Sequence, residues 1–506
     1  MCGIAGVIDL QINKNKSNNN NCELVQKMLN NIHHRGPDES GILNVNGYAV
    51  GAVRLTMLGD KQGKQPLKND KSVLIFNGEI YNYKNIAKDY LGDISGIKSD
   101  SYALFKFLNR HSLKKINLLN GMFSFCYIDE NDIYLVRDRF GEKPLYYTIK
   151  NNRLFFASEI KAFSGIIDLK INLPEFYFYL EIPLVGETIF NDIFEVKPST
   201  YIRINRRNYN ISTHQYFSIF DIQTEEGSEG YLKDKLRWLV EDSIKIRIDT
   251  SLQYGVFISG GLDSSILALL TKPDVLLTYL PQSKLIDSEE AYADTIAALL
   301  PKSRYTKVSS SEGNFLNELI QTVYFNGGPT TTLAALSQYR LSKVLQSKNM
   351  RLAFSGLGID EFFNGYIRHA LSLIPQEYFD KKDFFSYKSL VEKINIKHPS
   401  SLIYASLLNR SEKVNRKFIQ SISTLFDRIN SKSASISICD AFFTLPPLLH
   451  TDDHLNMAFG IESRAPFLDY RLVSFALGLP THMKIKIDSQ KSKVYLKYLL
   501  VKIPCA

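Results

Sequence analysis

The sequence is poor in cysteine and in long apolar runs, and each shortage excludes a class of protein. Its 506 residues include five cysteines and one tryptophan. The cysteines are odd in number, scattered and without a CxxC pair, which excludes a disulfide framework and a clustered-cysteine metal site. They are Cys2, Cys22, Cys126, Cys439 and Cys505. No apolar run approaches a membrane span, and a polar tract follows the first residues where a signal peptide would continue. We therefore expect a cytoplasmic protein with no membrane partner.

Charge is only slightly unbalanced. Lysine and arginine number 61 against 52 acidic residues, which gives a net charge of +9. The lysines are interleaved with Asn, Ile and Tyr rather than clustered, so we expect solvated faces and no nucleic-acid partner. A chain of this length exceeds one hydrophobic core, so two domains or more are expected.

The pattern of elements divides the chain into residues 1–205, a linker at 206–230 and residues 231–506. The first part has short apolar runs bounded by Gly, Asn and Asp, such as Ser72–Phe76, which predict strands. Acidic and glycine residues mark the linker. After it, apolar strands alternate with helices, beginning with the strand at Tyr254–Ile258, and this alternation predicts a parallel α/β sheet.

Cys2 is the first candidate catalytic residue. If the initiator Met1 is removed, one residue carries a thiol with a pKa of about 8.5 and a free α-amine with a pKa of about 7.7. The amine can then take the proton of the attacking thiol. Without support from other residues, Cys2 would be an ordinary N-terminal residue.

Support comes from residues suited to amide hydrolysis. Asn77, Gly78 and Glu79 follow an apolar run, which places them at a strand end. The Asn77 side-chain amide and the Gly78 N–H could both donate to a developing oxyanion. Arg54 can bind a carboxylate bidentately, and Asp100 can hold an ammonium group. Taken alone, Asn77-Gly78 is also typical of a hairpin turn, and Arg54 of a surface ion pair.

Several segments resemble, in sequence order, the class II glutamine amidotransferase domain of glutamine-hydrolysing asparagine synthetases. They are Cys2-Gly3-Ile4, His34–Asp38, Arg54-Leu55-Thr56, Asn77–Asn82, Gly121-Met122-Phe123, Arg137–Gly141 and Lys143–Tyr146. The resemblance implies an N-terminal-nucleophile αββα sandwich with Cys2 as nucleophile, Asn77 and Gly78 as oxyanion hole, and His34–Asp38 covering the glutamine. The implied glutamine-binding residues are Arg54, Leu55, Thr56, Met57, Leu58, Asn77, Gly78, Glu79 and Asp100.

A second candidate site lies between a strand and a helix, at Ser259–Ser265. Small residues let backbone N–H groups surround a phosphate at a helix N-terminus, and Asp263 could reach Mg²⁺ on that phosphate. The order Ser-Gly-Gly-x-Asp-Ser-Ser resembles the pyrophosphate loop of ATP pyrophosphatases. It differs from a Walker A loop because the terminal Gly-Lys is missing.

The resemblance to asparagine synthetases continues through residues 235–500. It implies that Asp360 joins Asp263 in binding Mg²⁺, and that Lys493 neutralises charge during adenylation and amide formation. Lys493 is otherwise one more solvated lysine of a lysine-rich run. A further matching block contains Asp453, Met457, Glu462, Arg464 and Pro466–Asp469. The implied ATP-binding residues are Ile258, Ser259, Gly260, Gly261, Asp263, Ser264, Ser265, Thr278, Ser355 and Gly356.

The resemblance implies a two-site enzyme with an α/β ATP-pyrophosphatase domain behind the sandwich. Cys2 would release ammonia from glutamine, ATP would activate a carboxylate as an acyl-adenylate, and ammonia would cross a tunnel to form the amide. Aspartate is the default acceptor, and asparagine, AMP and pyrophosphate are the products. The protein could assemble as a homodimer, and the sequence leaves its oligomeric state open.

Three departures concentrate at the second site. Leu357 stands near the adenylate where the family has an acid, Gly327-Gly328 replace an acidic pair before Pro329, and the sequence stops soon after Lys493. Leucine supplies no acid–base help. Two alternatives therefore stay open beside asparagine synthesis: an amidotransferase acting on another carboxylate, and a binding protein with a degenerate synthetase site. Cyclising relatives, which typically lose the nucleophile, are disfavoured by Cys2, Arg54 and Asn77.

Overall fold

A computed structural model gives the fold over most of the chain. It describes residues 1–10, 20–57, 61–92, 95–173, 185–249, 251–281, 287–311, 313–330, 332–373, 399–408, 416–486 and 491–492. Two predicted site residues, Leu58 and Lys493, lie outside the described residues.

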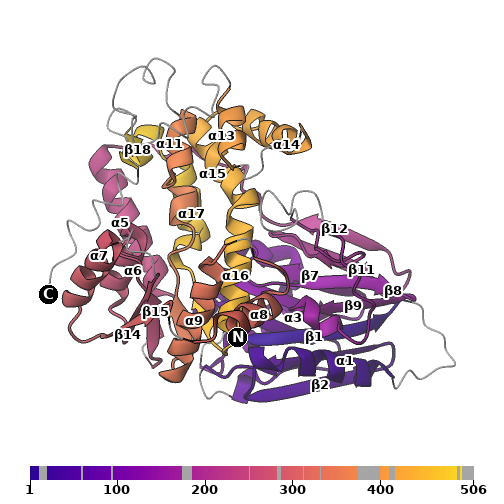
Figure 1. Ribbon diagram of the computed structural model, residues 1–506. Helices are drawn as coiled ribbons and strands as arrows, with labels where there is room; N and C mark the ends of the chain where they lie inside the picture. Colours follow the sequence, from indigo (N-terminus) through magenta and orange to yellow (C-terminus); the bar gives the residue numbers. More distant parts are fainter. Residues whose placement is uncertain are drawn as a thin grey trace.

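Two stacked antiparallel sheets form the first part of the protein (Figure 1). One sheet has the order β10 (Phe194–Glu195), β8 (Tyr146–Lys150), β9 (Arg153–Ala157), β1 (Cys2–Asp9), β3 (Tyr48–Arg54), β2 (Glu39–Val45). The other has the order β12 (Ile211–Gln215), β11 (Thr200–Asn205), β7 (Asp132–Arg137), β6 (Gly121–Ile128), β5 (Val73–Ile80), β4 (Leu67–Lys68). The predicted strand at Ser72–Phe76 is confirmed, although it continues to Ile80.

Strand β1 shows how the layers pack. Ile4 and Ile8 lie in the core between the sheets, whereas Ala5 and Val7 face the core under helix α1 (Asn20–Asn31). This alternation follows from the two-residue period of a strand. Helix α3 (Asp100–His111) packs on β5 of the other sheet through a third core, and the short helix α2 (Tyr83–Ile86) precedes it. The result is the predicted αββα sandwich.

The second part is built on a five-stranded parallel sheet. Its order is β15 (Arg304–Ser309), β14 (Val275–Leu280), β13 (Tyr254–Phe257), β16 (Leu352–Phe354), β17 (Glu462–Arg464). The chain runs outward from β13 to β15 and then resumes at β16 on the other side, so the strand order reverses between β13 and β16. Crevices at such reversals, beyond the carboxyl ends of the strands, are where open α/β sheets bind ligands.

Helices cover this sheet and extend beyond it. They are α5 (Glu229–Lys245), α6 (Leu262–Thr271), α7 (Asp287–Ala298), α8 (Phe315–Asn326), α9 (Ala334–Ser347), α10 (Ile359–Phe362), α11 (Ile367–Leu373), α13 (Ser400–Leu408), α14 (Arg416–Asp427), α15 (Lys432–Phe443), α16 (Leu445–Met457), α17 (Tyr470–Gly478) and α18 (Thr481–Lys484). The short strands β18 (Ile485–Lys486) and β19 (Lys491–Ser492) pair after them. None of the helices in the described part of the chain is both long and apolar enough to span a bilayer.

The fold class predicted from the sequence is confirmed: an αββα sandwich is followed by a parallel-sheet α/β domain. The boundaries at 205 and 230 stay predictions. Strand β12 falls inside the predicted linker and pairs with β11 as the outer strand of its sheet, and α5 already begins at Glu229. Helix α16 lies against the first domain (Figure 1), held by polar contacts described below.

Candidate active site

Cys2 lies at the start of β1 in a buried position. The register of β1 and β3 places it opposite Arg54. The Cys2 N–H donates to Asn77 Oδ1 at 3.1 Å, and Gln65 Nε2 lies 3.4 Å from the Cys2 Sγ. Burial raises the pKa of the Cys2 thiol, against the opposing effects of the chain's α-amine and Arg54. Met1 is in place in this structure, so removal of Met1 would turn the Cys2 amide nitrogen into the free amine expected beside the thiol.

Asn77 and Gly78 lie inside β5, so their predicted position at a strand end is wrong. The ladder with β6 continues through both residues, which also excludes the hairpin-turn alternative. Asn77 is fully buried, its Oδ1 accepts from Cys2, and its Nδ2 has no hydrogen-bond partner among the described residues. Gly78 has a φ of 147°, and a Cβ there would lie 2.1 Å from the Met122 carbonyl oxygen. Only glycine fits such a backbone position.

The residues predicted to hold the charged end of glutamine surround this strand. Arg54 Nη1 contacts Glu39 Oε2 at 2.8 Å. Asp100 begins α3, and its Oδ2 accepts from the Ile80 N–H at 3.0 Å. Burial and the neighbouring Asp100 raise the pKa of Glu79 to about 8. A ligand with an ammonium group would relieve this pairing of two carboxyl groups.

The segment after Arg54 closes over the start of the chain. The Leu55 N–H donates to the Met1 carbonyl at 2.8 Å, and the Thr56 N–H donates to Asp38 Oδ2 at 2.8 Å. Leu55 shares a buried cluster with Met1, and Met57 packs against that cluster. Asp38 belongs to the predicted covering segment, so the structure brings that segment and the predicted glutamine-binding loop together.

The α-amine has a partner that sequence reasoning missed. The Met1 ammonium lies 3.2 Å from Glu462 Oε2 of the second domain, and both groups are fully buried. Burial lowers the pKa of this amine, but Glu462 and other acidic neighbours outweigh that effect and raise it. Glu462 belongs to a block that was identified only by its resemblance to asparagine synthetases. Its contact with Met1 joins residues that are far apart in the sequence, so no local pattern predicts it.

The predicted ATP site lies beyond the carboxyl ends of β13 and β16, where the strand order reverses. Thr278 Oγ1 donates to the Ile258 carbonyl at 2.9 Å, so these two predicted residues are brought together. Gly260 has a φ of 78°, and a Cβ there would lie 2.4 Å from the Glu289 carbonyl oxygen. Gly261 caps α6, and its carbonyl accepts from Ser265 Oγ at 2.8 Å. The loop therefore places a helix N-terminus and small residues at the end of β13, an arrangement that suits a phosphate.

The residues predicted to bind Mg²⁺ lie on two adjacent turns. Asp263 is in the first turn of α6, and Asp360 is in α10. A Cβ built on Gly356 would lie 3.5 Å from the Asp263 Cβ, so the Ser355-Gly356 turn rests against the Asp263 loop. Among the described residues no group of three metal-ligating side chains exists. Two carboxylates beside a phosphate site fit Mg²⁺, which keeps water and phosphate oxygens as its other ligands.

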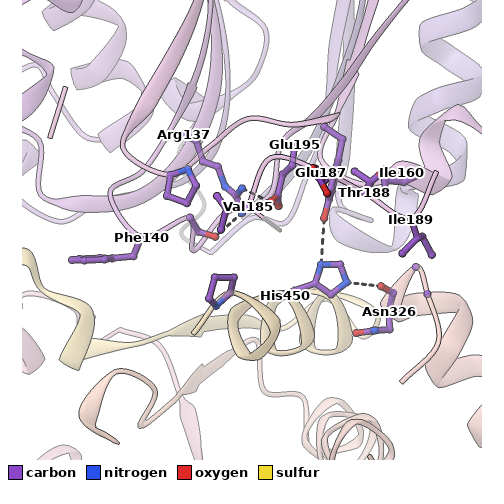
Figure 2. Close-up of a pocket in the computed structure, with 16 residues that line it drawn as sticks. Arg137, Phe140, Ile160, Val185, Glu187, Thr188, Ile189, Glu195, Asn326 and His450 are labelled. Carbon is purple, nitrogen blue, oxygen red and sulfur yellow. Dashed lines mark hydrogen bonds and ion pairs between the residues drawn. The ribbon is translucent and has the colours of Figure 1, made fainter. Parts of the chain in front are cut away.

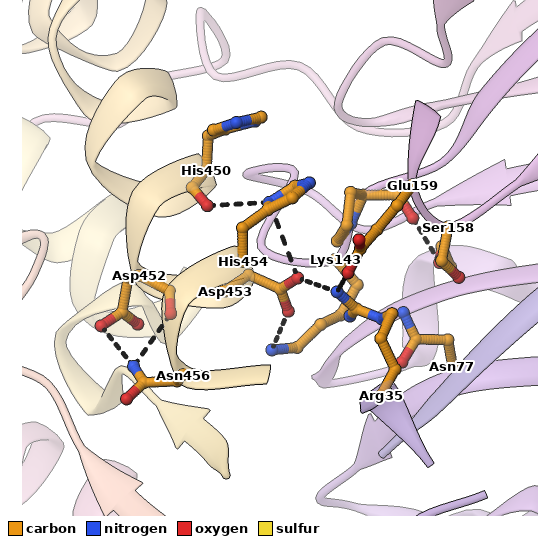
Figure 3. Close-up of polar contacts among 12 residues, drawn as sticks. Arg35, Asn77, Lys143, Ser158, Glu159, His450, Asp452, Asp453, His454 and Asn456 are labelled. Carbon is orange, nitrogen blue, oxygen red and sulfur yellow. Dashed lines mark hydrogen bonds and ion pairs between the residues drawn. The ribbon is translucent and has the colours of Figure 1, made fainter. Parts of the chain in front are cut away.

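A buried ionic network joins the two domains (Figure 3). Arg35 Nη1 contacts Glu159 Oε1 at 2.8 Å and Asp453 Oδ2 at 2.7 Å, and Lys143 Nζ contacts Asp453 Oδ1 at 3.1 Å. The two cations hold the pKa of Asp453 well below its usual range despite burial. Arg35 Nε also donates to the Cys2 carbonyl at 3.3 Å, so the network reaches the nucleophile. Arg35 and Asp453 belong to segments that the sequence analysis identified, whereas Glu159 was not identified.

Two cavities lie near α16. One of about 350 Å³ is lined by Ser355, Leu357 and Asp452, next to the predicted ATP turn. A smaller one of about 70 Å³ lies against the first domain (Figure 2). There the His450 Nε2 lies 2.6 Å from the Asn326 carbonyl oxygen. Gly327 and Gly328 line the smaller cavity, so these departures from the family pattern border the domain interface.

Comparison with known families agrees with this two-site arrangement. A model of the glutamine amidotransferase domain matches residues 1–217, and the asparagine synthase model matches residues 235–503, more than half of the chain. The chain belongs to the asparagine synthase family. The family predicted from sequence is thus confirmed, and the protein is a glutamine-hydrolysing ligase of that family.

Individual members of the asparagine synthase family are distant from this chain. Asparagine synthetase [glutamine-hydrolyzing] 1 of Bacillus subtilis is 28% identical over 97% of this chain and 83% of its own. Asparagine synthetase B of Escherichia coli is 28% identical over 72% of this chain and 65% of its own. The amidase chry2 of Gibberella zeae is 23% identical over 94% of this chain and 82% of its own. Relatives with similar coverage therefore carry different activity names.

Proposed function

We propose that the protein releases ammonia from glutamine at Cys2 and uses it, with ATP, to amidate a carboxylate through an acyl-adenylate. Aspartate is the default acceptor, with asparagine, AMP, pyrophosphate and glutamate as products. The single observation that carries the first step is the buried Asn77 Nδ2, which has no hydrogen-bond partner among the described residues, on the side chain whose Oδ1 accepts from the Cys2 N–H. A buried donor without a partner costs about 1–3 kcal/mol, which a ligand oxygen would offset.

The first site suits hydrolysis of a side-chain amide. The Cys2 Sγ attacks the amide carbon, and the oxygen takes negative charge between Asn77 Nδ2 and the Gly78 N–H. Collapse of this intermediate expels ammonia and leaves a γ-glutamyl thioester, which water then hydrolyses to glutamate. The α-amine exposed by loss of Met1 accepts the thiol proton and passes it to the leaving nitrogen.

The second site suits activation of a carboxylate. The loop at Ser259–Ser265 would hold the pyrophosphate part of ATP, and Asp263 with Asp360 would hold Mg²⁺, which neutralises phosphate charge. The acceptor carboxylate attacks the α-phosphorus and releases pyrophosphate. Ammonia then attacks the acyl carbon and displaces AMP. Because the Arg35–Asp453 network lies between the sites, we place the ammonia route along this interface.

The test separates the two sites with one substitution. Cys2→Ala is expected to abolish glutamine-supported amide formation and to leave ammonium-supported formation unchanged. Amide formation is measured by mass spectrometry, and pyrophosphate by a coupled assay. If glutamine serves the variant as well as the wild type, the nucleophile assignment is wrong.

A second candidate, amidation of another carboxylate, is favoured by the cavity beside Leu357. Among its described lining residues the charged side chains are Arg368 and Asp452. Arg368 Nη2 already contacts both carboxylate oxygens of Asp440 at 3.0 Å. The α-carboxylate of free aspartate would thus find no uncompensated cation among these residues, and burying an unpaired charge is costly.

A comparison of acceptors decides between the candidates. Pyrophosphate release is measured with ammonium and L-aspartate, its α-amide, N-acetyl-aspartate and longer monocarboxylic acids. The second candidate predicts faster release with acceptors that lack a free α-carboxylate. Faster release with L-aspartate than with its α-amide would leave asparagine synthesis as the function.

A further inference from the structure

Arg464 belongs to the second domain, yet its side chain reaches the glutamine site of the first. It ends β17, the edge strand of the parallel sheet. Its Nε lies 2.6 Å from Glu462 Oε1, and its Nη2 lies 3.4 Å from Glu79 Oε2. Only 5% of the Arg464 side chain is exposed. The guanidinium also lies 5.8 Å from the centre of the ring of Tyr81, which directly follows the end of β5.

Glu79 sits among two acidic and two basic groups. It faces Asp100 from α3, Glu462 and Arg464 from β17, and the α-ammonium at the start of β1. Burial and Asp100 raise the pKa of Glu79 to about 8, and Arg464 is the foremost neighbour that opposes this rise. The α-ammonium is already paired with Glu462. Without Arg464, the Glu79 carboxyl would therefore be protonated over a wider pH range.

We propose that Arg464 is a positioning residue of the glutamine site, supplied across the domain interface to orient Glu79 and to favour its ionised form, which pairs with the α-ammonium of glutamine. This inference rests on the proposed glutamine site and adds a member from the synthetase domain. A protonated Glu79 cannot pair with an ammonium group, so glutamine affinity falls as pH falls through the pKa of Glu79.

The backbone of Arg464 links this contact to the nucleotide site. The β16–β17 pairing sets Phe354 opposite Arg464, and the Ser355 N–H donates to the Arg464 carbonyl at 2.9 Å. Ser355 begins the turn predicted to bind ATP. A nucleotide that moves this turn therefore moves the residue that holds Glu79. Glutamine and ATP are expected to raise each other's affinity, and measured couplings of this kind are about 5- to 150-fold.

The experiment measures glutamine binding without turnover. Isothermal titration calorimetry is carried out on the full chain carrying Cys2→Ala, alone and with Arg464→Gln or Arg464→Lys, at pH 7 and pH 8.5. Arg471→Gln is the matched control, because Arg471 pairs with Asp242 and Asp469 of the same domain. Thermal unfolding of each variant confirms that it is folded.

Arg464→Gln is expected to weaken glutamine binding by about tenfold at pH 7, the effect of one pKa unit. At pH 8.5 the loss should shrink to about threefold, because part of Glu79 then ionises without Arg464. Arg464→Lys should lie between wild type and Arg464→Gln, and Arg471→Gln should bind as wild type does. ATP should tighten glutamine binding to Cys2→Ala, and Arg464→Gln should reduce that effect.

Two results would overturn the inference alone: unchanged binding by Arg464→Gln at pH 7, or a loss of equal size at both pH values, which would indicate a purely structural role. A different result would overturn the proposed glutamine site and the inference with it. That result is a folded Cys2→Ala protein that binds no glutamine at either pH.

Discussion

The two candidate sites differ in what holds them. At the first site, Cys2, Arg54 and Asn77 lie on strands whose register fixes their spacing. At the second, the residues lie on turns beyond the ends of β13 and β16, and much of the Ser259–Ser264 loop is half-buried or exposed. A change inside a strand disturbs two sheets, whereas a change in a turn alters the ligand and spares the scaffold. Leu357, which departs from the pattern of the resemblance, lies on such a turn, between β16 and α10.

The largest expected effect comes from the first site, whose residues lie on strands. Asn77→Ala removes one oxyanion donor, and loss of such a donor lowers kcat by about 10²- to 10³-fold. Glutaminase activity is measured as glutamate release at saturating glutamine. Ammonium-supported amide formation in the same variant is the internal control and should stay within about twofold. A glutaminase rate near that of the wild type would contradict the role of Asn77.

The next effect tests the second site, whose residues lie on turns, and here the synthetase activity rather than the glutaminase activity should fall. Asp263→Asn removes a carboxylate proposed to bind Mg²⁺, and the loss of several kcal/mol of charge stabilisation corresponds to about a hundredfold in rate. Pyrophosphate release should fall by that factor, with partial recovery at high Mg²⁺. Glutamate release without ATP should stay unchanged, because the proposed hydrolysis at Cys2 needs no Mg²⁺. Equal loss of both activities would show that the sites are not separable.

The sequence predicted those parts of the sites that depend on local geometry. Gly78 and Gly260 could be recognised because their backbone conformations and close contacts require glycine. That requirement appears in the sequence as a glycine at a fixed place in a motif. Strand β1 was not predicted, since both of its faces are buried and its residues show no polar alternation. The strand end assigned to Asn77 was wrong because the last polar residues of β5 face the site rather than solvent.

Contacts between distant parts of the chain could not be predicted. Gln65 approaches Cys2 and pairs with the Phe76 backbone, yet no pattern around it distinguishes it from a surface glutamine. Glu159 and Glu462 meet partners more than 120 residues away. Such pairs are set by how strands pack within a domain and how the two domains pack on each other, and a single sequence carries no local trace of that packing.

Buried charge gives a second contrast between the domains. At the interface Arg35, Glu159, Lys143 and Asp453 are buried together, and each has an opposite charge within 3.1 Å. Lys484 in α18 is 1% exposed, and its Nζ has no hydrogen-bond partner among the described residues. Burial lowers the pKa of Lys484 to about 7. The opposite charges of the interface network therefore compensate the cost of burying them. The cost of burying the Lys484 ammonium is not offset by any hydrogen-bond partner among the described residues.

This contrast leads to the smallest predicted effect, a change of stability with pH. Unfolded Lys484 has a pKa of about 10.4, so between pH 7 and pH 10 the unfolded chain binds more protons than the folded one. Stability contributed by this site therefore rises with pH, by about 1.4 kcal/mol per unit above pH 7.5. Lys484→Met should remove that slope and raise the urea midpoint at pH 7, whereas Lys27→Met on the exposed face of α1 should leave both unchanged. A midpoint at pH 7 that falls in Lys484→Met would mean that the buried amine has a stabilising partner, and the contrast with the interface network would disappear.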